Sequence, residues 1–343
     1  MNTFRHVVLF SLIVFLFLLA CSKDKKSNPL SYVDRYNPKL TATKGTTYTG
    51  NFLPIAADNE WDYTGVMSGL YTIKISGTYA GQPVNETDQD TLDNSYCFAV
   101  SRILSPIQAT LSGISYSLLP EQGEADLGIN SSESKIMRYY QATDSVVYIR
   151  AVPGPNGLVE VEDPVFMKTR LVVGDSWYSN PSVNTNALIS DDVSDIDMTA
   201  TCRLLVIGTD SVTFYNRTLG TWVTQEAVQV DEIAEFNGKI KLEEYGNTDM
   251  SLSGKVLVHL YLVENLGIVA SVDHYEIDIT GKITDTGTSL KLTISLAVDD
   301  ELLLSYYDVN MAKPRPTLFS KQLLPPVQNI LEQATNLVGL FRW

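Results

Sequence analysis

Cysteine, histidine and basic side chains are scarce in this sequence. Its 343 residues include three cysteines and three histidines, and its 25 lysines and arginines are outnumbered by 40 aspartates and glutamates. So few cysteines exclude a zinc finger, a multi-cysteine metal cluster and a disulfide-dense scaffold. The formal net charge of −15 argues against nucleic-acid binding, which needs a basic surface. We therefore expect no nucleic-acid partner, and nothing in the composition indicates a cofactor.

Motifs that would name a reaction are also missing. The sequence contains no G-x-G-x-x-G, P-loop or G-x-S-x-G motif, so the common nucleotide-binding and serine-nucleophile signatures are absent. No strand–helix–strand unit of about 30 residues is recognisable, which disfavours a parallel α/β sheet. We predict no catalytic residues. A carbohydrate-active enzyme remains an alternative, because it needs only two carboxylates and these are plentiful.

The first long apolar run predicts a secretory signal. It covers residues 7–20, which is short of the roughly 20 residues that span a bilayer, and it follows a basic start. The run ends in Leu18-Leu19-Ala20-Cys21, which resembles the lipobox of bacterial lipoproteins. In that family the signal peptide is removed before the cysteine, which then receives a diacylglycerol thioether and an N-acyl chain such as palmitate. The resemblance implies a signal peptide at residues 1–20 and a lipid anchor at Cys21.

A small, charged segment follows the cysteine. Residues 22–29 end in proline and have too little apolar surface to fold. We predict that residues 21–45 form a lipidated flexible tether. Ser22 stands where an aspartate would resemble the inner-membrane retention signal. The resemblance thus implies a protein held by Cys21 in the bacterial outer membrane, on its periplasmic face or at the cell surface.

Short β-branched and aromatic runs, separated by glycine, asparagine and aspartate, dominate the rest of the chain. Residues 71–77 and 211–215 are typical strand segments. We predict an all-β fold of antiparallel sheets, either a sandwich or a curved open sheet. Residues 208–210 and 299–300 carry turn signals.

A proline- and glycine-rich segment, residues 153–157, suggests a boundary near residue 163. We predict a first β module at residues 46–163 and a second at residues 164–318. The alternative is one large sheet shared by both halves, which all-β folds of this size permit.

A weak internal repeat supports the two modules. Aligned on Trp61 and Trp177, both segments have an apolar residue six positions earlier, asparagine or aspartate two positions earlier, and tyrosine one or two positions later. We expect a tight turn, which includes Gly174 and Asp175 in the second copy, and then a strand that opens with a buried tryptophan.

The same segments resemble a group of uncharacterised envelope lipoproteins. The pattern of that group is roughly Pro-Leu-x-x-Gly-Asn-x-Trp-x-Tyr, followed later by Gly-hydrophobic-Val, to which residues 267–269 are similar. The resemblance implies an envelope location and a β-rich fold, and it brings no assigned activity.

Residues 251–279 are expected to form a β-hairpin. A register that pairs Lys255 with Glu276 joins opposite charges across the strands. It also places His259 and His274 diagonally on one face, with Glu276 beside His274. These three residues are candidate metal ligands, and the alternative is two half-buried strand histidines.

Cys97 and Cys202 are the cysteines that remain after lipidation. In an oxidising compartment they could form a disulfide, which would close a loop of roughly a hundred residues. The alternative is two small buried apolar side chains.

The last residues predict a helix. After Pro325 and Pro326, apolar residues recur at spacings of three and four from residue 327 to residue 341, which is typical of an amphipathic helix. We predict that residues 319–343 contain a helix that packs on the sheet. The leading interpretation is a lipid-anchored envelope protein that binds a ligand or a protein or glycan partner. The alternatives to this interpretation are a carrier of an apolar molecule in a β cavity, closed by residues 326–341, and the carbohydrate-active enzyme.

Overall fold

The structure is a computed structural model, and it describes nine stretches of the chain. They are residues 39–126, 135–154, 157–162, 165–178, 182–183, 193–216, 219–242, 247–285 and 287–304. The described residues form antiparallel strands and no helix, so the prediction of an all-β antiparallel fold is confirmed. The predicted signal peptide, Cys21 and the predicted C-terminal helix lie outside the described residues.

The strands, in chain order, are β1 (Thr47–Thr49), β2 (Glu60–Tyr79), β3 (Gln82–Ile103), β4 (Ile107–Leu111), β5 (Ile114–Asp126), β6 (Lys135–Ala142), β7 (Val146–Gly154), β8 (Gly157–Glu162), β9 (Val165–Lys168), β10 (Arg170–Val172), β11 (Ser176–Tyr178), β12 (Ser182–Val183), β13 (Val193–Asn216), β14 (Thr221–Leu242), β15 (Asn247–Val263), β16 (Gly267–Asp285) and β17 (Thr288–Leu304).

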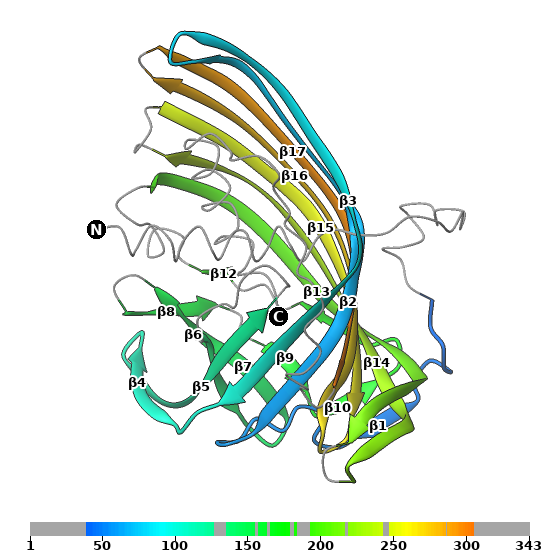
Figure 1. Cartoon of the computed structure of the whole chain (residues 1–343). Coiled ribbons are helices and arrows are strands. Elements are labelled where there is room, and N and C mark those ends of the chain that lie inside the picture. Colours follow the sequence, from blue (N-terminus) through cyan, green and yellow to red (C-terminus); the bar gives the residue numbers. More distant parts are fainter. Residues whose placement is uncertain are drawn as a thin grey trace.

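Seven long neighbouring strands form a curved sheet (Figure 1). Their order is β13-β14-β15-β16-β17-β2-β3, and each has 17 to 24 residues, whereas strands usually have five or six. The turns predicted at residues 208–210 and 299–300 are wrong, because both segments lie inside long strands. Gly208 instead marks a β-bulge, with a φ of 147° and a shift of register beside it.

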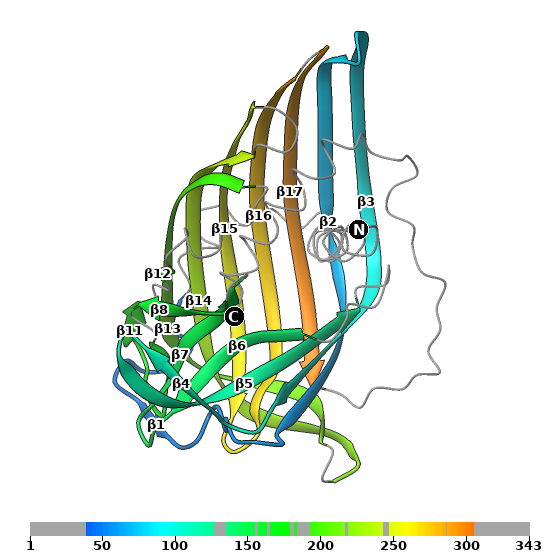
Figure 2. The ribbon, with the colours of Figure 1, turned by 90° about the vertical axis from the view of Figure 1, so that its left-hand side faces the viewer.

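The sheet then folds back over its own concave face. Only the last part of β3, Phe98–Ile103, pairs with β5, and the sheet continues from there through β6, β7, β8 and β12. In Figure 2 strands β5, β6 and β7 run across the lower half of the long strands. A shared core of aliphatic and aromatic side chains fills the space between the two layers.

The two faces of the long strands differ sharply in polarity. Along β16, buried Ile277, Ile279 and Ile283 alternate with exposed Asp278 and Lys282. Strands β2, β15 and β17 show the same alternation, which is the period of two that a half-buried sheet requires. The concave face is therefore apolar, and the convex face is polar.

The far end of the β13–β14 hairpin covers part of the convex face. β13 contacts β16 and β17, which are not its neighbours in the sheet. A small second core lies there, formed by Val212, Phe214, Ala227, Val263, Val269 and Ala270. This cover explains why polar side chains on the lower convex face, such as Gln229 and Asp231, are buried.

Strands from both sides of residue 163 share the large sheet, because β2 pairs with β17 along most of its length. This pairing does not test whether the two predicted modules fold independently, so that division stays a prediction. The predicted tether is too long at its C-terminal end. The Thr41 N–H donates to Ile207 O at 3.1 Å and the Gly45 N–H to Val173 O at 2.9 Å, and composition alone does not reveal such backbone hydrogen bonds.

Candidate functional site

The two strand histidines lie together on the convex face. The predicted pairing of Lys255 with Glu276 is present, and it sets His259 diagonally from His274. The centroids of the two imidazole rings are 5.6 Å apart, and the ring planes meet at 82°. The sequence therefore placed the two rings correctly.

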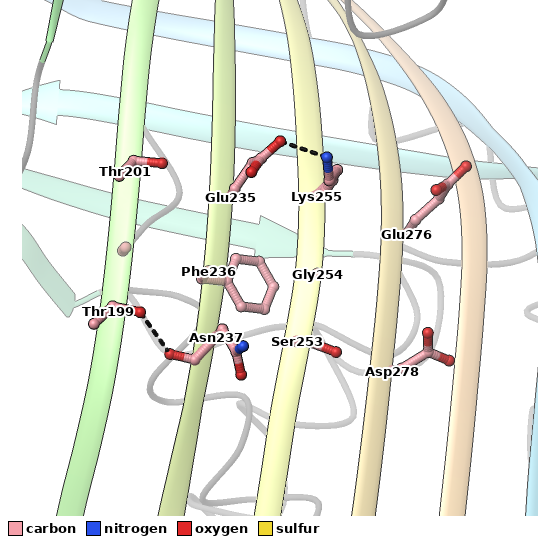
Figure 3. A pocket seen from close by; sticks show the side chains of 11 residues that line it. Thr199, Thr201, Glu235, Phe236, Asn237, Ser253, Gly254, Lys255, Glu276 and Asp278 are labelled. Carbon is pink, nitrogen blue, oxygen red and sulfur yellow. Dashed lines mark hydrogen bonds and ion pairs between the residues drawn. The ribbon is translucent and has the colours of Figure 1, made fainter. Parts of the chain in front are cut away.

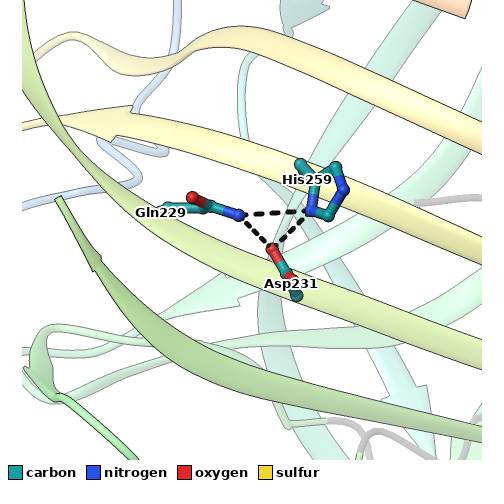
Figure 4. A network of polar contacts seen from close by, with 3 residues as sticks. All are labelled: Gln229, Asp231 and His259. Carbon is teal, nitrogen blue, oxygen red and sulfur yellow. Dashed lines mark hydrogen bonds and ion pairs between the residues drawn. The ribbon is translucent and has the colours of Figure 1, made fainter. Parts of the chain in front are cut away.

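A carboxylate contacts each histidine, and Figure 4 shows the contact of His259 with Asp231. Asp231, which is fully buried, accepts hydrogen bonds from His259 Nδ1 and from Gln229 Nε2, each at 2.7 Å. His274 Nδ1 is paired in the same way with Asp299 Oδ1. A carboxylate on Nδ1 orients an imidazole ring, so these contacts fix both rings against the sheet.

Glu276 does not complete a metal site with these histidines. Among the residues that the structure describes, no group of three histidine, cysteine or carboxylate side chains is arranged to hold a metal ion. Successive residues on one face of a strand are about 7 Å apart, and both imidazoles are engaged with other carboxylates. The geometry favours the alternative of two structural histidines.

The two repeat tryptophans occupy equivalent places in the fold. Each is the second residue of its strand, and each follows by three positions a residue with positive φ, Asp58 (70°) or Gly174 (86°). Both indoles are buried, and the N–H of Trp61 and of Trp177 donates to a backbone carbonyl. Asp175 contributes through its backbone, since its carbonyl accepts from the Val206 N–H at 3.0 Å. The repeat is a packing motif.

The two parts of the lipoprotein-like pattern contact one another. Trp61 Nε1 donates to Leu266 O at 2.6 Å, and the Tyr63 hydroxyl donates to Ile268 O at 3.1 Å. A Cβ added to Gly267 would lie 3.1 Å from Trp61 Nε1, and Gly267 has a φ of +90°. The pattern therefore records how β2 packs on the β15–β16 turn, and it marks no reacting group.

The structure does not bring the two cysteines together. Strands β14, β15, β16, β17 and β2 lie between β13, which carries Cys202, and β3, which carries Cys97. Cys202 is a buried thiol that donates to Glu232 Oε1 at 3.2 Å. The proposed disulfide is therefore not formed, because the chain separation said nothing about the order of strands in the sheet.

Aliphatic side chains line most of the upper half of the concave face, in the orientation of Figure 1, and buried Phe236 lies beside them, in register with Gly254 and Ile277. We call this set the aliphatic surface. It consists of Ile73, Ile75, Met250, Leu252, Ile277, Ile279, Ile283, Leu290, Leu292 and Ile294, all of which are buried. Strands β5, β6 and β7 cross the face below these residues, and no other strand within the described ranges crosses above them (Figures 1 and 2).

A row of polar side chains borders the aliphatic surface at mid-height. We call it the polar belt, and it consists of Glu121, Arg138, Tyr140, Cys202, Glu232, Asp273 and Tyr275. All seven side chains are buried. A buried charge is costly unless it is paired and hydrogen-bonded, so the contacts of the belt decide what it can do.

One end of the belt is an ion pair on the strands that fold back. Arg138 Nε lies 2.6 Å from Glu121 Oε2, and Glu121 also accepts from Tyr140 at 2.9 Å and from Ser101 at 2.6 Å. Burial alone would lower the pKa of Arg138, but the charges of Glu121 and Glu232 raise it. Arg138 therefore stays charged.

The other end of the belt lies on the long strands. Glu232 accepts from the Cys202 thiol, and Asp273 Oδ2 accepts from the Tyr275 hydroxyl at 2.5 Å. The pKa of Glu232 is raised to about 7, mainly by burial and also by the charge of Asp273, against the opposing effects of the Cys202 hydrogen bond and of Arg138. Burial likewise raises the pKa of the Cys202 thiol, so this cysteine is not an activated nucleophile.

Sequence reasoning missed the belt, although a signal was present. Glu232 stands between Val230 and Ala234 in the period of two, and Asp273 stands between Ser271 and Tyr275. Both acids therefore stand at positions in the alternation whose side chains belong to the buried face of the sheet. An acid at such a position either lies at a bend or is buried with a partner.

The convex face carries an open groove of about 520 Å³ (Figure 3). Its side chains are mostly exposed and polar, and Lys255 Nζ lies 2.5 Å from Glu235 Oε1. Exposed carboxylates such as Asp278 stay hydrated, so the groove lacks the water-excluding cleft in which paired carboxylates act on a sugar. The carbohydrate-active alternative gains no support from it.

No protein-family model matches the chain, and no curated protein matches it. Solved structures give weak matches, of which three follow. OccAB4 of Acinetobacter baumannii matches at 8% identity with a TM-score of 0.18, over 73% of this chain and 99% of that one. The TodX monoaromatic hydrocarbon channel, as a deltaS2 mutant, matches at 9% identity with a TM-score of 0.16, over 80% and 100%. Outer-membrane expressed OmpT of Vibrio cholerae matches at 9% identity with a TM-score of 0.15, over 74% and 99%. Likenesses this low establish no shared fold.

Within the described ranges no helix has the length and apolar character needed to cross a bilayer.

Proposed function

We propose that this chain is a lipid-anchored protein of the bacterial envelope that carries an apolar molecule on the concave face of its sheet. The observation that carries the proposal is the aliphatic surface. Ten apolar side chains, drawn from four adjacent strands, face one way at mutually adjoining positions. Keeping such a side chain out of water contributes about 1.5–3 kcal/mol, so these buried side chains favour an apolar cover. We propose that the carried molecule supplies part of that cover.

The dimensions of the surface suit a long, flexible molecule. Along β16 it extends from Ile277 to Ile283, which is about 20 Å at 3.3 Å per residue. Its side chains are isoleucine, leucine and methionine, which offer no hydrogen-bonding group and no flat ring. Such a surface fits acyl chains better than it fits sugars or peptides. We propose that residues 326–341, with their predicted apolar stripe, close over it.

The anchor rests on the sequence. The resemblance of Leu18-Leu19-Ala20-Cys21 to a lipobox supports attachment to the membrane by acyl chains, and several chains together give stable anchoring. We expect Cys21→Ser to yield an unacylated chain that leaves the membrane fraction. Radiolabelled palmitate incorporation and membrane fractionation test this. Unchanged fractionation of the variant would contradict the anchor while leaving the carrier proposal intact.

Probe binding to a soluble chain tests the carrier proposal. A chain of residues 22–343, stripped of bound lipid with organic solvent and refolded, is titrated with a fluorescent long-chain alcohol. We expect saturable binding that Ile279→Glu weakens by at least about tenfold, since a carboxylate in an apolar site costs several kcal/mol. The matched control is Thr280→Glu, one residue away on the exposed convex face, which should bind as the parent does.

Two further measurements keep the result interpretable. Circular dichroism shows whether Ile279→Glu still folds. Ile279→Trp, which fills space without adding charge, should also reduce the number of probe molecules bound. Equal binding by the parent and by Ile279→Trp, with both chains folded, would contradict the proposal.

A further inference from the structure

We infer that the polar belt binds the headgroup of an amphiphile, that this headgroup is a hydrogen-bond donor such as an amine, and that its tail lies along the aliphatic surface. The inference rests on the proposed function and names the class of molecule carried. Three observations support it: the place of the belt, its unused acceptor and its charge.

The belt lies at one end of the aliphatic surface. On β16 the side chains of Asp273, Tyr275, Ile277 and Ile279 follow one another on the same face. Glu232 is in register with Val258 and, through it, with Asp273, so the two acids share one row across the sheet. A molecule that lies along β16 therefore meets apolar side chains over most of its length and carboxylates at one end.

Near this end, Glu232 and Ser271 each have a polar side-chain atom with no hydrogen-bond partner among the residues that the structure describes. Glu232 Oε2 and Ser271 Oγ are buried, and neither makes a hydrogen bond. Glu232 is 5% exposed and Ser271 1%. A buried polar atom left without a partner destabilises the folded chain, because it has lost its hydrogen bonds to water. A donor on a bound headgroup would offset this cost at Glu232.

The net charge of the belt determines whether it favours a cationic or an anionic headgroup. Its carboxyl groups are those of Glu121, Glu232 and Asp273, and its one basic group, Arg138, is already paired with Glu121. The belt therefore has an excess of acid, which repels an anionic headgroup and attracts a cationic one. With its pKa near 7, Glu232 can also pair with a neutral hydroxyl when it is protonated.

Three probes with the same tail and different headgroups test the inference. Dodecylamine, dodecanol and dodecyl sulfate compete with the fluorescent alcohol for the stripped chain of residues 22–343, each below its micelle concentration. We expect the amine to bind best and the sulfate worst, with at least about a tenfold difference, as for hydrogen bonds to charged groups.

Variants separate the belt from the acidity of the whole protein. Glu232→Gln keeps the shape and an acceptor for Cys202, and we expect it to cost the amine about tenfold while dodecanol binding stays the same. The matched control is Glu235→Gln, three residues along β14 on the exposed convex face, which should leave the amine unaffected. Dodecanol binding also reports that each variant is folded.

The two proposals fail in different ways. If dodecanol and the amine both fail to bind the folded parent chain, the carrier function is wrong and the headgroup inference falls with it. If all three probes bind equally, or if Glu232→Gln and Glu235→Gln behave alike, the function stands and the belt is a structural ion network. A water molecule that satisfies Glu232 would give this second result.

Discussion

The lower and upper halves of the concave face use different side chains. The lower half, under β5–β9, packs with aromatic residues that include Trp61, Tyr140, Phe166 and Trp177. Their polar ends are anchored, as when Trp61 Nε1 donates to Leu266 O. In the upper half the ten side chains of the aliphatic surface carry no ring and no hydrogen-bonding group, and buried Phe236 and Thr248 lie at its margins. Rigid rings with a polar handle specify one protein partner, whereas an aliphatic surface accepts a molecule of no fixed shape.

Removing the rings of the lower half should have the largest effect. We expect Trp61→Ala and Trp177→Ala each to lower the free energy of unfolding by about 3–5 kcal/mol, because each leaves a cavity between two fixed layers. Trp222, which is 54% exposed, provides the control, and Trp222→Ala should change stability little. Urea denaturation followed by circular dichroism measures all three. Equal losses of unfolding free energy in all three variants would contradict the distinction between core and surface tryptophans.

Matched leucines sharpen the comparison between the halves. Leu260 lies in the lower half and Leu292 in the upper, and both are 0% exposed. We expect Leu260→Ala to cost about 2–5 kcal/mol in the lipid-stripped chain and Leu292→Ala less than about half of that, because a site that can collapse costs less. The same denaturation experiment applies. A Leu292→Ala cost as large as that of Leu260→Ala would show that the upper half is packed by protein.

Glu232, at the border of the two halves, gives stability a pH dependence. Its pKa is about 7 in the folded chain against an ordinary 4.5, so the folded state holds the proton more tightly than the unfolded state. The contribution of this group is therefore present at low pH and is lost as the pH rises from about 4.5 to about 7. We expect Glu232→Gln to gain stability relative to the parent on the order of 3 kcal/mol between these limits.

Denaturation of both chains near pH 4 and near pH 8 measures this difference. Glu235→Gln, whose parent side chain is 53% exposed, serves as the control. The difference in unfolding free energy between the parent and Glu232→Gln should change between the two pH values. The same difference at both would mean that Glu232 is hydrated or ionised throughout.

The smallest effect is expected on the convex face. Lys255 and Glu235 form an ion pair at 2.5 Å, with side chains 29% and 53% exposed. Exposed pairs contribute about 0–1 kcal/mol, so Lys255→Ala should barely shift the denaturation midpoint. A loss comparable to that of Leu260→Ala would show that the convex groove is a structural site.

Local patterns in the sequence were enough to predict the all-β fold class and the register of one strand pair. The period of two around Ile277 and the opposite charges of Lys255 and Glu276 both correspond to contacts between neighbouring strands. Residues typical of turns led to wrong turn predictions where they lie inside very long strands. Gly208 accommodates a bulge, and Asp299 pairs with a histidine on the next strand, so neither interrupts its strand.

Long-range features could not be read in this way. The fold-back of β5–β9 brings Arg138 close enough to Glu232 for their charges to interact, although 94 positions of sequence separate them. Nothing near either residue predicts that proximity. Glu232 and Asp273 stand at strand positions where the alternation predicts apolar residues. These two acids were the one signal in the sequence for a buried polar belt on the concave face.

A native mass spectrum tests the carrier account most directly. The chain of residues 22–343 is directed to the bacterial periplasm without its lipid anchor and purified without detergent. We predict a stable excess mass that organic solvent removes and that is reduced in Ile279→Glu but not in Thr280→Glu. A bare chain mass for the folded parent, with no excess before solvent treatment, would contradict the account.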